Sequence, residues 1–191
     1  MEEPFIILLG SRCRVSFDLM TLKLRRMSGV FEWLWTDSFE DLVWILEKLL
    51  KEESVAIQQR GDNLYLEGTH IHTRHYKLEE YRVLFERRAA RLRAMVSQKE
   101  RPVLFIRDEE VSDMSQEAFD CFRQVLYDYN PDLLWYFILF SKTHLKQMPR
   151  VFVYPYTDNK EEYIECLRRA YPYWNTTTTT THARGADHDD A

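Results

Sequence analysis

A cysteine that follows the first apolar run has the surroundings that nucleophilic catalysis requires. Residues 5–9 form a short apolar run typical of a buried strand, Gly10 ends the run, and Cys13 opens the amphipathic segment that follows. A helix N-terminus presents unpaired N–H groups and a positive partial charge, which stabilise a thiolate. Arg12 and Arg14 add positive charge on either side. Cys13 is therefore the candidate nucleophile, with a small buried hydrophobe as the alternative interpretation.

The other two cysteines have a different pattern. Cys121 and Cys166 lie mid-helix on apolar faces, so the sequence predicts that both pack in the core. Three widely spaced cysteines are typical of a reduced protein and not of a disulfide framework. A tyrosine-phosphatase loop is excluded, because it needs an arginine six positions after the cysteine and Leu19 occupies that position.

A nucleophilic cysteine needs a base, and the chain offers three clustered histidines, His70, His72 and His75. In an extended segment His70 and His72 would share one face, and His75 would take the other. One interpretation is that a histidine of this cluster serves Cys13 as base. The other is an edge strand that carries polar histidines. No further ligands follow at the spacing of a zinc site, so we expect no metal.

An arginine-rich segment offers a second kind of chemistry. Residues 77–98 contain neither Gly nor Pro and are rich in Leu, Arg, Glu and Ala, which predicts a helix. Arg87, Arg88 and Arg91 would share one broad face. This face is either a patch for phosphate or nucleic acid, or a solvated face balanced by the glutamates of the same helix. A nucleic-acid partner is disfavoured, because the net charge is −5 and no aromatic side chains interleave with the arginines.

The elements that must position these residues form one predicted domain over residues 4–174, of α+β or mixed α/β class. Strands are expected at 5–9, 55–57, 64–66, 69–76, 103–106, 133–140 and 151–154. Helices are expected at 13–27, 39–50, 77–98, 115–129 and 158–171. Ser38 and Asp41 resemble a capping box before the second helix. Ser115 and Asp158 are expected to cap the last two helices. Residues 175–191 include six consecutive Thr and lack hydrophobic periodicity, which predicts a disordered tail.

Composition and hydropathy indicate which class of protein this is and where it is expected to be located. The 191 residues are 45% hydrophobic and 30% charged, which suits a domain whose core needs no disulfide or metal. No apolar run approaches the roughly 18 residues of a membrane span, and the acidic start is unlike a signal peptide. The sequence therefore predicts a cytoplasmic protein without a membrane partner. We expect no cofactor, and the chain has no Gly-rich phosphate loop.

Four blocks of the sequence, taken in order, resemble a known family. Leu8–Cys13 is similar to its opening "SLGSxC", and residues 28–33 are similar to its "GPFDW" block. Residues 85–91 are similar to its "Y-x-R-R-x-x-R" helix, and Leu104–Arg107 to its "LFIR" strand. Over residues 5 to about 140 the chain thus resembles the papain-like cysteine peptidase family known as domain of unknown function 1796, which occurs in bacteria and large DNA viruses.

The resemblance implies a papain-like single domain in which Cys13 pairs with a histidine on a following sheet. The family histidine lies in an "HDF"-like segment before the arginine helix. His75 fits that place best, His72 next and His70 third. Glu32 stands where the family has an aspartate, and either Glu32 or Asp108 would orient the imidazole.

The resemblance also implies a substrate and a reaction. Arg87, Arg88 and Arg107 would form structural ion pairs or bind a carboxylate or phosphate of the substrate. In the implied reaction Cys13 attacks a carbonyl of a peptide or other acyl substrate, and the acceptor is water, an amine or an alcohol. The alternative is a catalytically degenerate papain-like scaffold that serves as a viral structural or host-protein-binding protein. A viral protein of this kind would lie in the host cytoplasm or the virion.

Overall fold

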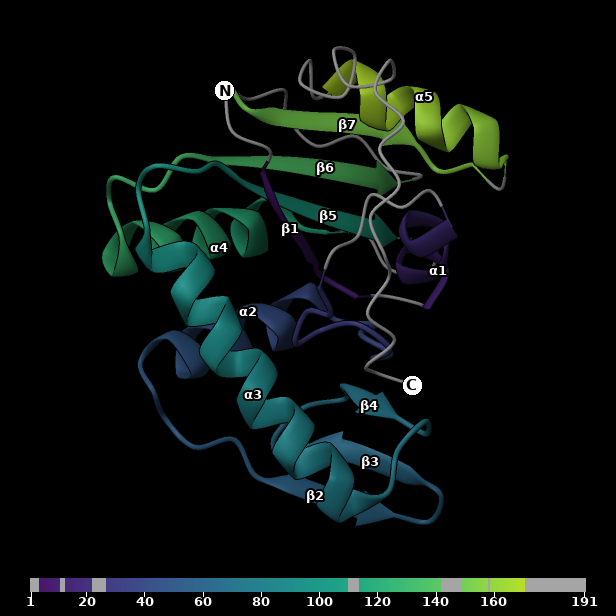
Figure 1. Cartoon of the computed structure of the whole chain (residues 1–191), viewed down its shortest axis with the longest axis vertical. Coiled ribbons are helices and arrows are strands. Elements are labelled where there is room, and N and C mark those ends of the chain that lie inside the picture. Colours follow the sequence, from purple (N-terminus) through teal and green to yellow (C-terminus); the bar gives the residue numbers. More distant parts are fainter. Residues whose placement is uncertain are drawn as a thin grey trace, which may run out of the picture.

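Two β-sheets organise the chain, and helices cover both faces of the larger one (Figure 1). The computed structural model describes residues 4–10, 13–21, 27–109, 114–141, 149–157 and 159–170. The strands are β1 (Phe5–Leu8), β2 (Ile57–Arg60), β3 (Asn63–Leu66), β4 (His72–Thr73), β5 (Val103–Glu109), β6 (Trp135–Ser141) and β7 (Val151–Pro155). The helices are α1 (Cys13–Thr21), α2 (Phe39–Leu50), α3 (Leu78–Ser97), α4 (Gln116–Tyr129) and α5 (Lys160–Ala170). The predicted mixed α/β class is confirmed.

The larger sheet is parallel and has the strand order β1-β5-β6-β7. Every residue of β5 is buried, because helices cover both faces of the sheet. The sequence predicts this strand only over 103–106, and the three residues that follow, Arg107, Asp108 and Glu109, are charged. The strand nevertheless continues through all three residues, which pair in register with β6. Charged side chains thus enter the interior at the carboxyl end of the sheet.

The parallel sheet separates two hydrophobic cores, and successive side chains of β5 point alternately into one and the other. Phe105 faces the larger core, which lies beneath α2, α3 and α4. Ile106 faces the smaller core, which contains Leu19 of α1 and Tyr163 of α5. The result is a layer of helices on each face of the parallel sheet (Figure 1).

The smaller sheet is an antiparallel meander with the order β2-β3-β4. The predicted hairpin is confirmed, and Gly61 adopts a φ of +60° in its turn. The predicted strand at 69–76 shortens to His72–Thr73. Two hydrogen bonds join this strand to the segment before α2: Trp35 N–H donates to the His72 carbonyl at 2.7 Å, and His72 N–H donates to the Trp35 carbonyl at 3.1 Å. Helix α3 runs from the smaller sheet toward the larger one (Figure 1).

The helix signals of the sequence agree with the structure at most ends. Ser38 Oγ accepts a hydrogen bond from Asp41 N–H at 3.0 Å and caps α2, as predicted. Ser115 Oγ accepts from Ala118 N–H at 3.0 Å and caps α4 in the same way. The predicted cap at Asp158 and the predicted tail at 175–191 lie outside the described residues.

One expectation about the core was wrong. Cys121 is exposed, because the buried face of α4 is formed by Phe119, Phe122 and Leu126. Cys166 is half-buried and packs against the smaller core, in partial agreement with the prediction. Among the described residues, no helix is long and apolar enough to cross a membrane.

Gly10 offers a test of how tightly the segment before Cys13 is packed. Gly10 and Gly61 have nearly the same left-handed φ, +64° and +60°. A Cβ at Gly10 would lie 2.7 Å from Thr36 Oγ1, whereas a Cβ at Gly61 would meet nothing. We expect Gly61→Ala to lower the free energy of unfolding by about 1–2 kcal/mol through backbone strain alone. Gly10→Ala should cost about 1–3 kcal/mol more because of overpacking.

Urea unfolding followed by circular dichroism measures both variants, and Gly61→Ala is the control for the backbone term. Equal losses in the two variants would show that Thr36 can move away at little cost.

Candidate functional site

The carboxyl end of β1 brings the candidate nucleophile to an edge of the parallel sheet. Strand β1 ends at Leu8, Gly10 turns the chain, and α1 begins at Cys13. The predicted strand, turn and helix around Cys13 are therefore present. The structure describes the backbone of Cys13, and its thiol lies outside the described part.

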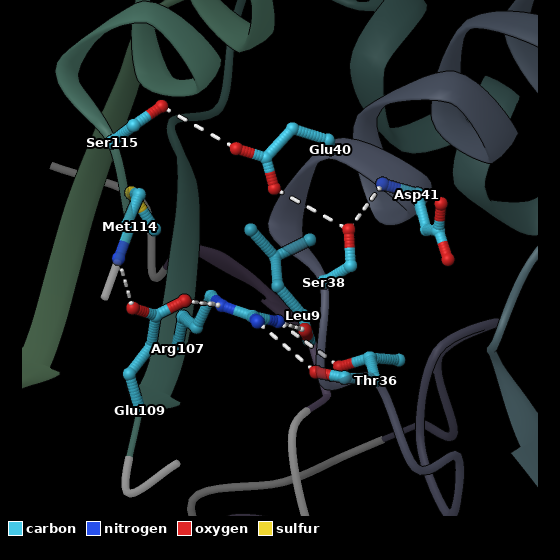
Figure 2. A network of polar contacts seen from close by, with 9 residues as sticks. All are labelled: Leu9, Thr36, Ser38, Glu40, Asp41, Arg107, Glu109, Met114 and Ser115. Atoms are coloured by element: carbon cyan, nitrogen blue, oxygen red, sulfur yellow. Dashed lines mark hydrogen bonds and ion pairs between the residues drawn. The ribbon is translucent and has the colours of Figure 1, made fainter. Parts of the chain in front are cut away.

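Arg107 is the centre of the polar contacts at this edge (Figure 2). Its Nη1 donates to the Leu9 carbonyl at 2.7 Å and to Thr36 Oγ1 at 3.0 Å. Its Nη2 donates to the Thr36 carbonyl at 3.1 Å, and its Nε donates to Glu109 Oε1 at 2.6 Å. The guanidinium also lies over the ring of Phe39, 5.0 Å from the centroid. Arg107 thus fastens the end of β1, the segment before α2 and the end of β5 to one another.

The Arg107–Glu109 ion pair is fully buried, with neither side chain exposed. Burial lowers the pKa of Arg107 from its ordinary value, and the Glu109 carboxylate opposes that change. Glu109 uses its second oxygen to accept a hydrogen bond from Met114 N–H at 2.6 Å. Arg107 therefore positions neighbouring segments of the chain, since its hydrogen bonds are made to other residues of the protein.

The N-termini of α2 and α4 meet beside this ion pair (Figure 2). Glu40, in the first turn of α2, accepts hydrogen bonds from Ser38 Oγ and from Ser115 Oγ, each at 3.3 Å. Asp41 accepts from the backbone N–H of His70 at 2.8 Å. Carboxylates are favoured at helix N-termini, because the free N–H groups there carry positive partial charge. The edge of the sheet where α1 begins therefore also receives the capped ends of two further helices.

Glu32 forms a hydrogen bond within its own loop segment. Glu32 is buried, and its Oε1 accepts a hydrogen bond from Gly29 N–H at 2.6 Å. The next residue, Trp33, has a left-handed φ of +64°, which is unusual for a residue with a side chain. The Trp33 indole meets the His75 ring edge-on, with 5.9 Å between centroids. His75 therefore contacts the residue that follows Glu32 in the chain.

His72 is the histidine with the most defined surroundings. Its ring stacks on Trp35, with 5.9 Å between centroids, and on Tyr65, with 5.1 Å. Its Nδ1 lies 3.1 Å from the His70 carbonyl, which can only accept. Nδ1 therefore carries the proton of the neutral ring, and Nε2 is left as the basic nitrogen.

The arginines of α3 do not form one solvated face. Arg88 is buried, and its Nη2 donates to Tyr76 Oη at 3.4 Å. Arg91 Nη1 donates to the Ser28 carbonyl at 2.9 Å, whereas Arg87 is exposed. Arg88 bonds to Tyr76, whereas Arg107 bonds to Leu9, Thr36 and Glu109, so the predicted substrate-binding arginines lie in different surroundings. Among the described residues, no group of three or more His, Cys, Asp or Glu side chains could hold a metal ion.

Comparison of the chain with models of protein families, with curated proteins and with solved structures gives no match.

Two residues of this site, Thr36 and Glu109, escape the sequence analysis. The signal for Glu109 is its spacing from Arg107, because residues i and i+2 of a strand lie on one face. Thr36 has no such signal, since it reaches Arg107 only through the path of the loop.

The buried ion pair can be tested with Glu109→Gln, which keeps the shape and removes the charge. We expect the free energy of unfolding to fall by about 3–5 kcal/mol, because Arg107 then lacks its buried counter-ion. Asp120→Asn is the matched control, since the Asp120–Arg123 pair is about half exposed. It should cost no more than about 1 kcal/mol.

Guanidinium chloride unfolding measures both losses. Should Glu109→Gln fail to fold, the double variant Arg107→Met/Glu109→Leu should recover a folded protein. Equal losses for the buried and the exposed pair would contradict the part assigned to Arg107.

Proposed function

We propose that the protein is a cysteine-dependent hydrolase or acyltransferase of papain-like type, with Cys13 as its nucleophile. The observation that carries the proposal is the place of Cys13: it is the first residue of α1, the helix that follows the first strand of the parallel sheet. Ligand sites of open parallel sheets lie at the carboxyl ends of the strands. The four sequence blocks that resemble the papain-like family add support, and one of them contains Cys13.

The position of Cys13 favours a reactive thiol for a physical reason. The first residues of a helix have unpaired N–H groups, and their positive partial charge stabilises an anion. Thiolates at helix N-termini form at lower pH than free cysteine, whose pKa is about 8.5. Backbone N–H groups at the start of α1 would in addition stabilise an oxyanion that develops on the substrate.

His72 is the base that the geometry supports best. With Nδ1–H held by the His70 carbonyl, Nε2 is available to exchange a proton. The Trp35 backbone pairs with His72, and the adjacent Thr36 lies against Gly10. A short run of contacts therefore connects His72 to the turn before Cys13. His75, the better match in the resemblance, remains the second candidate.

The proposed reaction is acyl transfer. The Cys13 thiolate attacks the carbonyl carbon of a peptide or other acyl group, and the leaving group departs with a proton from the histidine. The histidine then takes a proton from the acceptor, which is water, an amine or an alcohol, as the acceptor displaces the thiol from the acyl group. Glu32 or Asp108 would hold the imidazole in place.

The reactivity of Cys13 tests the proposal without knowledge of the substrate. We expect iodoacetamide to modify Cys13 rapidly at pH 6, because the thiolate is the reacting species. Cys121 is an internal reference for an exposed thiol in a helix. Burial raises the pKa of Cys166, so Cys166 should react more slowly than Cys13 at every pH. Peptide mass spectrometry after timed labelling from pH 5 to pH 9 gives the three rates.

If Cys13 reacts no faster at pH 6 than Cys121, the catalytic proposal is wrong. The chain would then be interpreted as a catalytically degenerate scaffold that binds another protein.

A second experiment identifies the histidine. We expect His72→Gln to slow the labelling of Cys13 at pH 6 about tenfold, which corresponds to an increase of about one unit in the pKa of the Cys13 thiol. At a pH below the pKa, each unit of increase lowers the thiolate fraction tenfold. His75→Gln is the matched control and should leave the rate unchanged. The opposite pair of results would assign the base to His75, as the resemblance ranks it, and would overturn the choice of His72.

A further inference from the structure

The outer side of α2 and α4 carries an elongated groove that the proposed reaction does not use. Its volume is about 450 Å³, and a smaller hollow of about 110 Å³ continues it between the same two helices. The two hollows share Glu47, Val125 and Asp128, so they form one continuous depression. We call it the α2–α4 groove.

The two helices that form the groove run in the same direction. Ser115, the cap of α4, donates to Glu40 in the first turn of α2. At the other end, Leu50 of α2 lines the groove together with Tyr129 of α4. The groove therefore follows α4 over most of its 14 residues, or about 21 Å. A depression of this length between two parallel helices has the shape that accepts a third helix.

The floor of the groove is apolar and partly open to solvent. It contains Val43, Trp44, Ala118, Cys121 and Val125. Trp44 is 41% exposed, although one edge of its ring lies over Gly68. Exposed aromatic side chains in a hollow are typical anchors of binding surfaces. The exposed Cys121 of α4 lies in the same floor.

The rim of the groove is acidic. Glu40, Glu117 and Asp128 line it, and none of the three forms an ion pair within the described residues. Glu47 also lines the groove, and Lys51 already pairs with it at 2.6 Å. Glu117 and Asp128 lie eleven residues apart on α4, about 16 Å along its axis. Two carboxylates at opposite ends of an apolar floor match two cations at the ends of an apolar stripe.

From this complementarity we propose that the α2–α4 groove binds a basic amphipathic helix of a partner protein. The partner presents apolar side chains at i, i+3, i+4 and i+7 to the floor. Its Lys or Arg side chains, about eleven residues apart, pair with Glu117 and Asp128. This inference is independent of the proposed catalysis, because no residue of the groove floor belongs to the candidate site.

The test uses a fluorescein-labelled probe peptide and the full chain. The peptide is a lactam-stapled helix of about 16 residues with a Leu stripe and two Lys about eleven residues apart. Fluorescence anisotropy should show saturable binding at one site. A peptide with Glu in place of both Lys should bind at least tenfold more weakly, and added salt should weaken only the Lys peptide.

Variants of the protein then locate the site. Glu117→Gln/Asp128→Asn should weaken binding of the Lys peptide about three- to tenfold. Asp62→Asn/Glu86→Gln is the matched control with the same net charge; neither residue makes a side-chain hydrogen bond or ion pair among the described residues, and binding should be unchanged. Cys121→Arg should abolish binding, because it fills the floor and places a cation between the rim carboxylates.

Three results would overturn the proposal. The Lys peptide could fail to bind at millimolar concentration, or it could bind the groove variants as tightly as the unmodified chain. Sedimentation could also show a dimer that Cys121→Arg dissociates, which would assign the groove to a second copy of the chain.

Discussion

The buried ion pair between Arg107 and Glu109 is the constraint on which the rest of the candidate site depends. A guanidinium with no exposed surface is tolerated only where protein groups replace its water. Here the replacements come from three parts of the chain: Leu9 after β1, Thr36 before α2, and Glu109 at the end of β5. Glu109 in turn holds Met114 N–H, next to the cap of α4. The charge can be buried only when all these segments are in place, so the pair couples the geometry of the edge to folding.

The two sheets carry different residues of the candidate site. The parallel sheet holds the turn at Gly10 and the start of α1, where the candidate nucleophile lies. The small antiparallel sheet holds His72. The joint between them is the segment that contains Trp35 and Thr36, since Trp35 pairs with His72 and Thr36 bonds to Arg107. Two adjacent residues therefore connect the small sheet to the end of β5 through hydrogen bonds.

The same edge also borders the α2–α4 groove. Glu40 lines one end of the groove and accepts hydrogen bonds from the serines that cap α2 and α4 (Figure 2). The acidic rim is therefore built partly from residues that stabilise helix N-termini, where a carboxylate is favourable for the fold itself. Glu40 and Glu117 thus combine a structural use at helix N-termini with an attraction for a cationic partner, whereas Asp128 lies in the last turn of α4, where the helix dipole does not favour a carboxylate.

The sequence by itself determined the local elements. The apolar runs, the serine caps at Ser38 and Ser115, and the Gly61 turn each act within a few residues, so composition and spacing were sufficient to predict them. The place of Cys13 at a helix start is of the same kind. Only the tertiary structure decided which distant residues meet. Thr36 reaches Arg107 across 71 positions of the chain, β5 extends through three charged residues because partners surround them, and Cys121 faces solvent because α4 buries other residues. These outcomes depend on long-range packing and on the compensation of buried charge, and neither is encoded in a local pattern.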